Sequence, residues 1–175
     1  MLKRAIPTSL RRRVHEGKRS HMRAAMRRVS ARGLSIGTVV DVGASDGRWS
    51  KQTMDYFPAA DYLLVEANPH HESALGVFCA AHPGTRFVLA AASDKTGTVR
   101  FNADDPFGGK ADPGEGSTAI EVDAIRLDDA IGPEARGPYL LKLDTHGYEV
   151  PILEGATDVL ANAGLVIIEV YNFKI

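Results

Sequence analysis

The strongest constraint in this sequence is a repeated order of short apolar runs and longer stretches with helical spacing. The apolar runs lack alternation between apolar and polar residues, which is typical of strands buried on both faces of a sheet. Strands joined through helices pair in parallel. We expect strands at 38–44, 62–66, 86–92, 139–144 and 165–170, and helices at 48–57, 71–82 and from 151 to about 164. The pattern predicts an α/β fold with a mostly parallel sheet and helices on both faces.

An excursion interrupts this repeat before the fourth buried strand. Residues 94–97 read as a turn that leads into a strand at 98–102, and 120–127 alternate like a half-exposed strand. Between them, 103–117 are rich in Gly, Pro and acidic residues and have no periodicity. We expect a long acidic loop there, with a role in acceptor selection or as a lid.

Charge divides the chain into two unequal parts. The 175 residues carry a formal net charge of -1, yet residues 1–33 hold 11 Lys and Arg against one acidic residue, and the rest hold 10 against 21. We expect a mobile basic arm over 1–18, and one domain over 19–175 that starts with a helix at 19–32 ended by Gly33. No aromatic residues interleave with the arginines of the arm, which argues against nucleic acid as its partner.

Cysteine and apolar content predict the cellular compartment. Cys79 is the single cysteine, which excludes an internal disulfide framework and favours a reducing compartment. The sequence has no Cys/His zinc spacing and no apolar run of about 18 residues, so neither a secretion signal nor a membrane span is expected. These features predict a soluble, cytoplasmic protein.

Glycine and acidic residues gather where the first two strands end. Residues 41–47 read Asp-Val-Gly-Ala-Ser-Asp-Gly and form a glycine-bearing turn at the start of a helix, which lets the backbone approach an anionic ligand. The spacing is neither the dinucleotide fingerprint nor a P-loop. Glu66 closes the second strand, where a carboxylate accepts hydrogen bonds from both hydroxyls of a ribose. Together they favour a nucleotide-type ligand.

A second polar group follows the fourth strand. Asp144, His146 and Glu149 are expected at the same sheet edge as Glu66, because carboxyl ends of parallel strands meet there. His146 is a candidate general acid or base, with a structural histidine as the alternative. Glu149 has the alternative of a helix N-terminal carboxylate. Glu169, inside an otherwise apolar strand, needs a partner or belongs to the site.

With these motifs the sequence resembles the FkbM-type family of S-adenosylmethionine-dependent methyltransferases. The resemblance covers 38–172 and is carried by 40–44 with Gly47, 65–69, 91–94 with Gly97, Leu127-Asp128, and above all 141–149 followed by 153–156. It implies a class I, Rossmann-like methyltransferase, commonly one that methylates a hydroxyl of a sugar, polysaccharide or secondary metabolite. The implied partner is then a small-molecule or carbohydrate acceptor.

The resemblance also implies residue roles. Asp41, Gly43 and Gly47 would line the methionine moiety, Glu66 the ribose, and Asp144 the region between cofactor and acceptor. The implied cofactor-binding residues are Asp41, Gly43, Ala44, Gly47, Glu66, Ala67, Ser93 and Asp144, and the candidate catalytic residues are His146 and Asp144. Some methyltransferases of related architecture use Mg²⁺, but no ligand spacing here predicts a metal site.

Two positions depart from the family pattern. The family often has Asn where Ser45 stands and Glu where His146 stands.

Two other functions stay open from the residues: a nicotinamide-dependent oxidoreductase, which the missing G-x-G-x-x-G argues against, and a non-catalytic binding module that uses the basic arm.

The last predicted strand is a candidate for an exposed edge. Related methyltransferases continue past the fifth strand with a helix and an antiparallel hairpin, for which this chain has few residues left. We therefore expect a sheet without the C-terminal hairpin, from a truncated chain or with its apolar edge covered by the N-terminal segment or by a second protomer.

Overall fold

The computed structural model describes residues 22–105, 107–111 and 118–170. The predicted arm over 1–18 lies outside the described residues. The chain divides into two compact units, Met1–Ser35 and Ile36–Ile175. In the first unit, residues 22–31 are helical, within the predicted range. Gly33 follows with φ +76° and donates its N–H to the Ser30 carbonyl at 3.0 Å, so the predicted C-cap glycine is confirmed.

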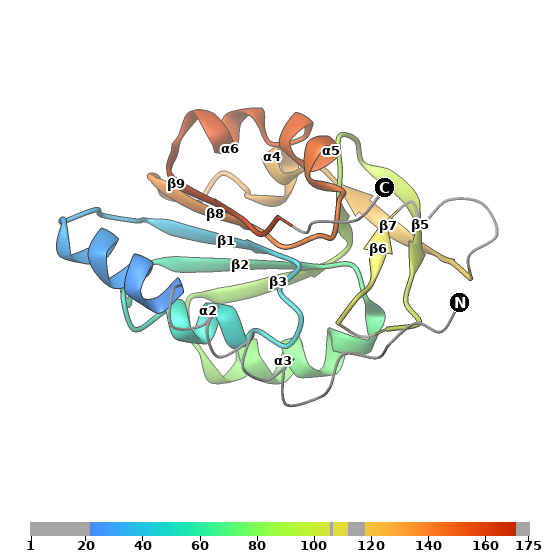
Figure 1. Ribbon diagram of the computed structural model, residues 1–175, viewed down its shortest axis with the longest axis horizontal. Coiled ribbons are helices and arrows are strands. Elements are labelled where there is room, and N and C mark those ends of the chain that lie inside the picture. The colour runs from blue at the N-terminus through green and yellow to red at the C-terminus, as the bar shows by residue number, and fades with distance from the viewer. Residues whose placement is uncertain (1–21, 106, 112–117, 171–175) are drawn as a thin grey trace, which may run out of the picture. The chain divides into compact units, whose positions relative to one another are not determined.

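A five-stranded sheet forms the centre of the second unit (Figure 1). Its strands are β1 (Thr38–Val42), β2 (Asp61–Glu66), β3 (Thr85–Leu89), β8 (Tyr139–Leu143) and β9 (Ala163–Ile168), in the order β3-β2-β1-β8-β9. All neighbours pair in parallel. Every residue of β1 is buried, as the absence of alternation predicted. The expected α/β fold with a parallel sheet is confirmed.

Helices cover both faces of this sheet (Figure 1). The helices α2 (Arg48–Thr53) and α3 (Glu72–Ala81) lie on one face, and α4 (Leu127–Ala130), α5 (Glu149–Glu154) and α6 (Thr157–Ala161) lie on the other. A short 3-10 turn, η1 (Pro69–His71), precedes α3. The core on the second face joins strand and helix side chains, among them Val40, Leu63, Leu141, Ile152 and Val159.

Two elements differ from the sequence prediction. The single helix expected to start at Pro151 begins instead at Glu149 and is broken into α5 and α6. At the break, Gly155 packs against the Ser93 carbonyl, and a new helix starts at Thr157. The third predicted strand, 86–92, is also divided: β3 ends at Leu89, and β4 (Ala91–Ala92) pairs with β7 (Ile120–Ile125) in a different sheet.

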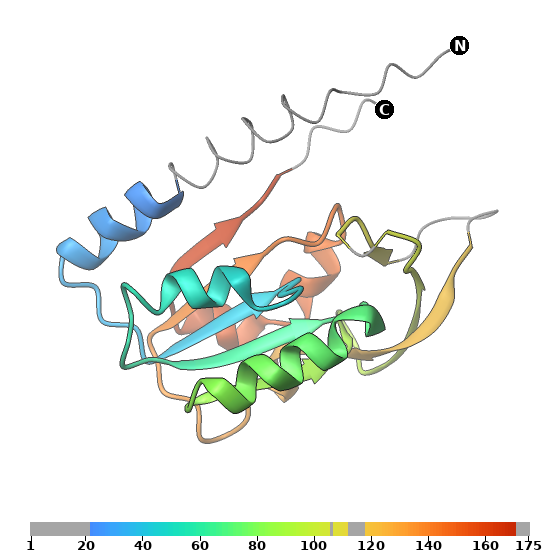
Figure 2. The same ribbon diagram turned by 90° about the horizontal axis from the view of Figure 1, so that it is seen from below.

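The predicted excursion is a second, four-stranded sheet. Its order is β4-β7-β5-β6, where β5 is Gly97–Asn102 and β6 is Lys110–Ala111. The strands β5 and β7 pair in antiparallel fashion. The chain bends at 94–96 and enters β5 at Gly97, but β4 and β5 lie on opposite sides of β7, so the predicted turn leads into a strand without forming a hairpin. The predicted acidic loop, 103–117, contains the short β6, and its residues 106 and 112–117 lie outside the described part. Figure 2 shows this small sheet beside the end of the main sheet.

The strand β9 forms an edge of the main sheet. It pairs with β8, and within the described residues no strand follows on its other side. Val166 and Ile168 are 39% and 40% exposed, so the expected apolar edge is present in this part of the structure.

Among the described residues, none of the helices has the length and apolar character that crossing a membrane requires.

Candidate functional site

The switch point of the main sheet lies between β1 and β8. The chain leaves β1 toward β2 on one side, whereas β8 pairs with β1 on the other. Ligands of open α/β sheets bind outside the carboxyl ends of the strands at such a point. The turns after β1 and β8 meet there, because the Asp144 N–H donates to the Val42 carbonyl at 3.1 Å.

Two glycines of the first turn are required by close packing. Gly43 has φ +70°, and a Cβ at this position would meet the backbone carbonyl of Asp144. Gly47 has φ +81°, and a Cβ there would lie 2.8 Å from the Phe78 ring. A side chain at Gly43 would push the two turns apart at the switch point. The glycine pattern thus has a packing cause as well as the ligand-binding one predicted.

Glu66 is held at the sheet edge by backbone donors on both sides. Its side chain ends β2 and is 7% exposed. Oε2 accepts the Ser45 N–H and Oε1 the Asn68 N–H, each at 2.7 Å. A carboxylate offers about four acceptor sites, so two remain for a ligand. The Ala44 N–H donates to the Val65 carbonyl at 3.2 Å, which joins the glycine turn to the same strand end, and the half-buried Ala67 follows directly.

A buried ion pair behind the glycine turn was not predicted. Asp41 and Lys142 are register partners in β1 and β8, and they are 0% and 5% exposed. The Lys142 Nζ lies 2.9 Å from the Asp41 Oδ1, and the Ser50 hydroxyl donates to the Asp41 Oδ2 at 2.7 Å. Both carboxylate oxygens therefore face protein groups, so a contribution of Asp41 to lining a ligand would be indirect. The sequence could have indicated this pair, because an acidic and a basic residue each stand inside an otherwise apolar predicted strand.

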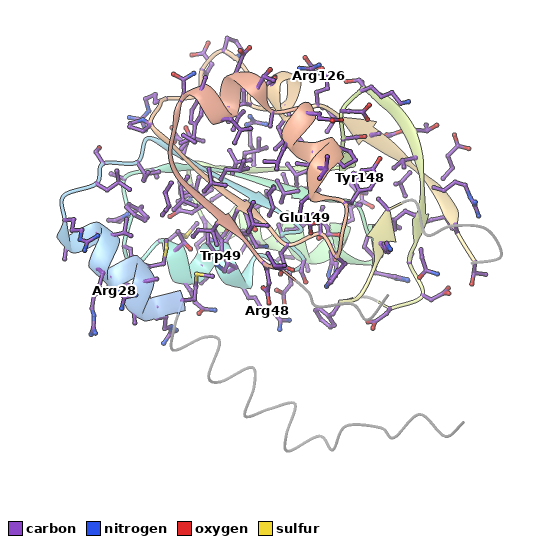
Figure 3. The ribbon with its side chains drawn as sticks, turned by 45° about the horizontal axis from the view of Figure 1, so that its top comes forward. Arg28, Arg48, Trp49, Arg126, Tyr148 and Glu149 are labelled. Carbon is purple, nitrogen blue, oxygen red and sulfur yellow. The ribbon has the colours of Figure 1, made fainter. Side chains whose placement is uncertain are left out.

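The turn after β8 is shaped by Glu149. Its Oε1 accepts the Gly147 N–H at 3.0 Å and the Thr145 hydroxyl at 3.2 Å. The residue is the first of α5, close to Tyr148 (Figure 3). This arrangement agrees with the alternative in which Glu149 is a helix N-terminal carboxylate.

His146 connects the same turn to the excursion. Its backbone has φ +54°, and its Nδ1 lies 3.2 Å from the Gly109 carbonyl. Because the partner is a carbonyl, Nδ1 is the donor. His146 and Asp144 are both half-buried and both follow the end of β8. The contact with Gly109 brings the segment before β6 to the candidate site.

Ser93 follows β4 and is 2% exposed. Its hydroxyl donates to the Asp94 Oδ1 at 2.9 Å and lies 3.2 Å from the Tyr148 hydroxyl. Tyr148 belongs to the distinctive motif after β8, so the structure joins two motifs that are 55 positions apart in the sequence. Sequence patterns gave no indication of this contact.

An exposed aromatic residue lies near the glycine turn. The Arg48 guanidinium lies 5.0 Å from the centre of the Phe107 ring, and the His71 ring lies 5.5 Å from it. Arg48 also donates to Asp46 at 2.6 and 2.7 Å, and this hydrogen bonding lowers the pKa of the Asp46 carboxyl below its usual value. Arg48 and Trp49 lie at the start of α2 (Figure 3).

The prediction for Glu169 is corrected. This residue lies just beyond β9 and is half-buried rather than enclosed within an apolar strand. Its N–H donates to the Leu143 carbonyl at 2.9 Å, which places its backbone beside the end of β8. Within the described ranges, no group of three or more His, Cys, Asp or Glu side chains is arranged to hold a metal ion.

Comparison with known proteins decides the family. The family model of the methyltransferase FkbM domain matches residues 41–174. The chain belongs to the FkbM methyltransferase family. Among solved structures, the chain is similar to the precorrin-6y C5,15-methyltransferase of Geobacter metallireducens GS-15, at 15% identity and a TM-score of 0.47, over 85% of this chain and 60% of that one. This chain thus spans less than two thirds of that protein. No curated protein was found to match it.

In this FkbM family member, most of the predicted site residues meet at one sheet edge. Contacts join the turn after β1, the end of β2 and the turn after β8. Ser93 is joined to this group through Tyr148, and Asp41 lies behind it. The edge combines acidic side chains, an imidazole and a tightly packed glycine turn, which are groups that can bind a nucleoside and accept a proton.

Proposed function

We propose that this chain is an S-adenosylmethionine-dependent methyltransferase that methylates a hydroxyl of a sugar, polysaccharide or secondary metabolite. The observation that carries the proposal is the Glu66 carboxylate, held by two backbone N–H groups at the switch-point edge. Membership of the FkbM family supports the same chemistry.

The residues of the edge fit an adenosyl group that carries a sulfonium. The remaining acceptor sites of Glu66 suit the two ribose hydroxyls. The half-buried Gly43 has no side chain to cover the backbone of this turn, and the Asp144 carboxylate favours a nearby cation. The proposed cofactor-binding residues are Gly43, Ala44, Gly47, Glu66, Ala67, Ser93 and Asp144, with Asp41 acting indirectly.

The chain's own groups align the acceptor and receive its proton. When bound, the cofactor supplies an electrophilic methyl group. Nδ1 of His146 donates to the Gly109 carbonyl, so Nε2 carries the lone pair of the neutral imidazole. We assign to Nε2 the removal of the proton from the acceptor hydroxyl, a step that general bases accelerate about 10²- to 10⁴-fold. Asp144 follows the same strand end as His146.

Calorimetric titration with S-adenosylhomocysteine tests the cofactor. We expect saturable binding by the folded chain, and a Glu66→Ala variant that binds about 10- to 100-fold more weakly, because hydrogen bonds to a charged acceptor are lost. Glu72→Ala, an exposed carboxylate at the start of α3, is the matched control. Absence of binding contradicts the proposal, and binding of NADH in its place supports the oxidoreductase.

A methylation assay across carbohydrates and secondary metabolites tests the acceptor class and His146. With an accepted substrate, His146→Ala should lower turnover by about 10²-fold or more and leave S-adenosylhomocysteine binding close to that of the unmodified chain. An unchanged turnover number would remove His146 from the reaction. Methylation of an amine in preference to every hydroxyl would contradict the acceptor class.

A further inference from the structure

Lys142 is a buried cation surrounded by oxygen atoms of the glycine turn. It is the next-to-last residue of β8 and is 5% exposed. Its Nζ donates to the Gly43 carbonyl at 2.9 Å and to the Val42 carbonyl at 3.2 Å. The same atom lies 2.9 Å from the Asp41 Oδ1 and 3.9 Å from the Asp144 Oδ2. One side chain therefore contacts both turns of the candidate site.

Stability alone does not account for such a group. Removing an ammonium and a carboxylate from water costs several kcal/mol per ion, and apolar residues of similar volume are often as stable or more so. Asp41 and Lys142 occupy buried positions, and the register partner of Asp41 in β2 is the fully buried Leu64, so an apolar pair would suit this part of the sheet. What an apolar pair cannot supply is a donor for the Gly43 carbonyl.

We propose that Lys142 is a positioning residue, which fixes the glycine turn after β1 against the end of β8. The inference rests on the proposed cofactor site. Gly43 packs against the Asp144 carbonyl. The carbonyl of Gly43 accepts a hydrogen bond from the Lys142 ammonium. The peptide that would contact the cofactor is thereby set in one orientation. The ammonium also lies between two carboxylates, so the three groups together carry one net negative charge, which suits a cationic cofactor.

A double variant separates positioning from stability. Lys142→Met leaves the Asp41 carboxylate buried without its cation, so its melting temperature should fall. The double variant Asp41→Asn/Lys142→Met has neither buried charge, and the side-chain amide oxygen at position 41 can still accept the hydrogen bond from the Ser50 hydroxyl. Its melting temperature should therefore recover. The Gly43 carbonyl lacks its donor in both variants. We therefore expect both to bind S-adenosylhomocysteine about tenfold more weakly or worse, whereas Lys95→Met, at an exposed turn lysine, should bind normally.

Two measurements on the ligand-free protein accompany the titration. The amide hydrogens of Gly43 and Asp144 donate to neighbouring strands, and their exchange should be faster in the double variant. Trp49 is the single tryptophan, and the Lys142 Nζ lies 5.7 Å from its ring, so its emission reports whether this corner has changed. Both readouts are independent of the cofactor.

The outcomes distinguish this inference from the proposed function. A double variant that is as stable as the unmodified chain but binds weakly, with faster exchange at both turns, supports positioning. Recovery of affinity together with stability overturns it, since Lys142 would then only balance the Asp41 charge. If the unmodified chain binds no S-adenosylhomocysteine, the proposed function fails. The exchange comparison then decides alone: faster exchange supports a positioning role, and unchanged exchange overturns it.

Discussion

Backbone conformation at single residues sets the shape of the candidate site. Among the described residues, Ser45 and His146 are the two non-glycine residues with positive φ, both at +54°. Such conformations are uncommon outside glycine, and Asn adopts them more readily than most residues. Each residue follows a strand end at the switch point, and each stands where the FkbM pattern often has another side chain. The Ser45 backbone donates its N–H to Glu66, so this contact does not depend on the side chain, and Asn at the same position would also adopt the required positive φ.

Gly47→Ala should destabilise the chain by about 2 kcal/mol or more. The new methyl group would meet the Phe78 ring at 2.8 Å, and φ +81° is strained for any L residue. Denaturant unfolding followed by Trp49 fluorescence measures the change.

Gly76→Ala is the matched control for Gly47→Ala. Gly76 lies within α3, and a Cβ there meets nothing within 4 Å. Alanine should therefore stabilise that helix by up to about 1 kcal/mol. If Gly47→Ala unfolds at the same denaturant concentration as the unmodified chain, close packing is not what requires Gly47.

Residue-level reasoning from the sequence identified most of the edge but not its supports. Glycines and strand-end carboxylates have recognisable local patterns, so Gly43, Glu66 and Asp144 were predicted to lie together. Lys142 and Tyr148 were missed, because their roles depend on partners in other strands. Pairing across strands is set by register, which periodicity in one segment does not contain.

At the level of elements, the break between α5 and α6 depends on an acid from a third helix. The residue before α6 is Ala156, which has no side-chain cap. Instead, Asp128 of α4 accepts the N–H groups of Asp158 and Val159 at 3.0 and 3.1 Å. This acid belongs to the Leu-Asp motif that resembles the family pattern, so the structure gives that motif a structural function. One continuous helix was predicted because its apolar spacing does not reveal a cap supplied from elsewhere.

Asp128→Ala should lower stability by about 1 to 2 kcal/mol at neutral pH, the usual cost of losing a helix cap. Burial alone would raise the pKa of the Asp128 carboxyl. The hydrogen bonds that it accepts from the Val159 N–H, the Thr157 hydroxyl, Arg126 and the Asp158 N–H together outweigh burial, so the pKa lies below its usual value. The contribution is therefore complete above the unfolded pKa of about 3.9 and is lost as the pH falls through the folded value.

Thermal unfolding between pH 2 and pH 7 measures this effect. The unmodified chain should lose more stability than Asp128→Ala as the pH falls below about 4. Asp129→Ala is the control, since within the described part of the chain this exposed carboxylate accepts a hydrogen bond from the Thr96 hydroxyl and caps no helix, and it should change stability by less than about 0.5 kcal/mol. Equal effects of the two substitutions would contradict the capping role.

For the whole molecule, the sequence predicted the architecture of the main sheet better than its boundaries. Buried strands such as β1 and β8 stand out because parallel strands covered on both faces are uniformly apolar. The switch of the chain from β3 to β4 was missed, since 86–92 is one apolar run and only pairing divides it. The excursion with its strands at 98–102 and 120–127 was predicted from turn residues and alternation, but its separate sheet was not. The strand β6 lies in a segment without periodicity, where pairing alone defines a strand.

Deleting residues 1–18 tests whether the activity resides in the second unit. Every proposed cofactor-binding and catalytic residue lies between Asp41 and His146, inside Ile36–Ile175. We therefore expect the shortened chain to bind S-adenosylhomocysteine within about twofold of the full chain, because the deletion removes none of these residues. Calorimetry at two salt concentrations makes the comparison. A binding module that acts through its basic arm predicts the opposite: anionic partners would be lost with the arm, together with the salt dependence that released counterions produce. A loss of cofactor binding on deletion would place part of the site in the first unit and contradict the assignment made here.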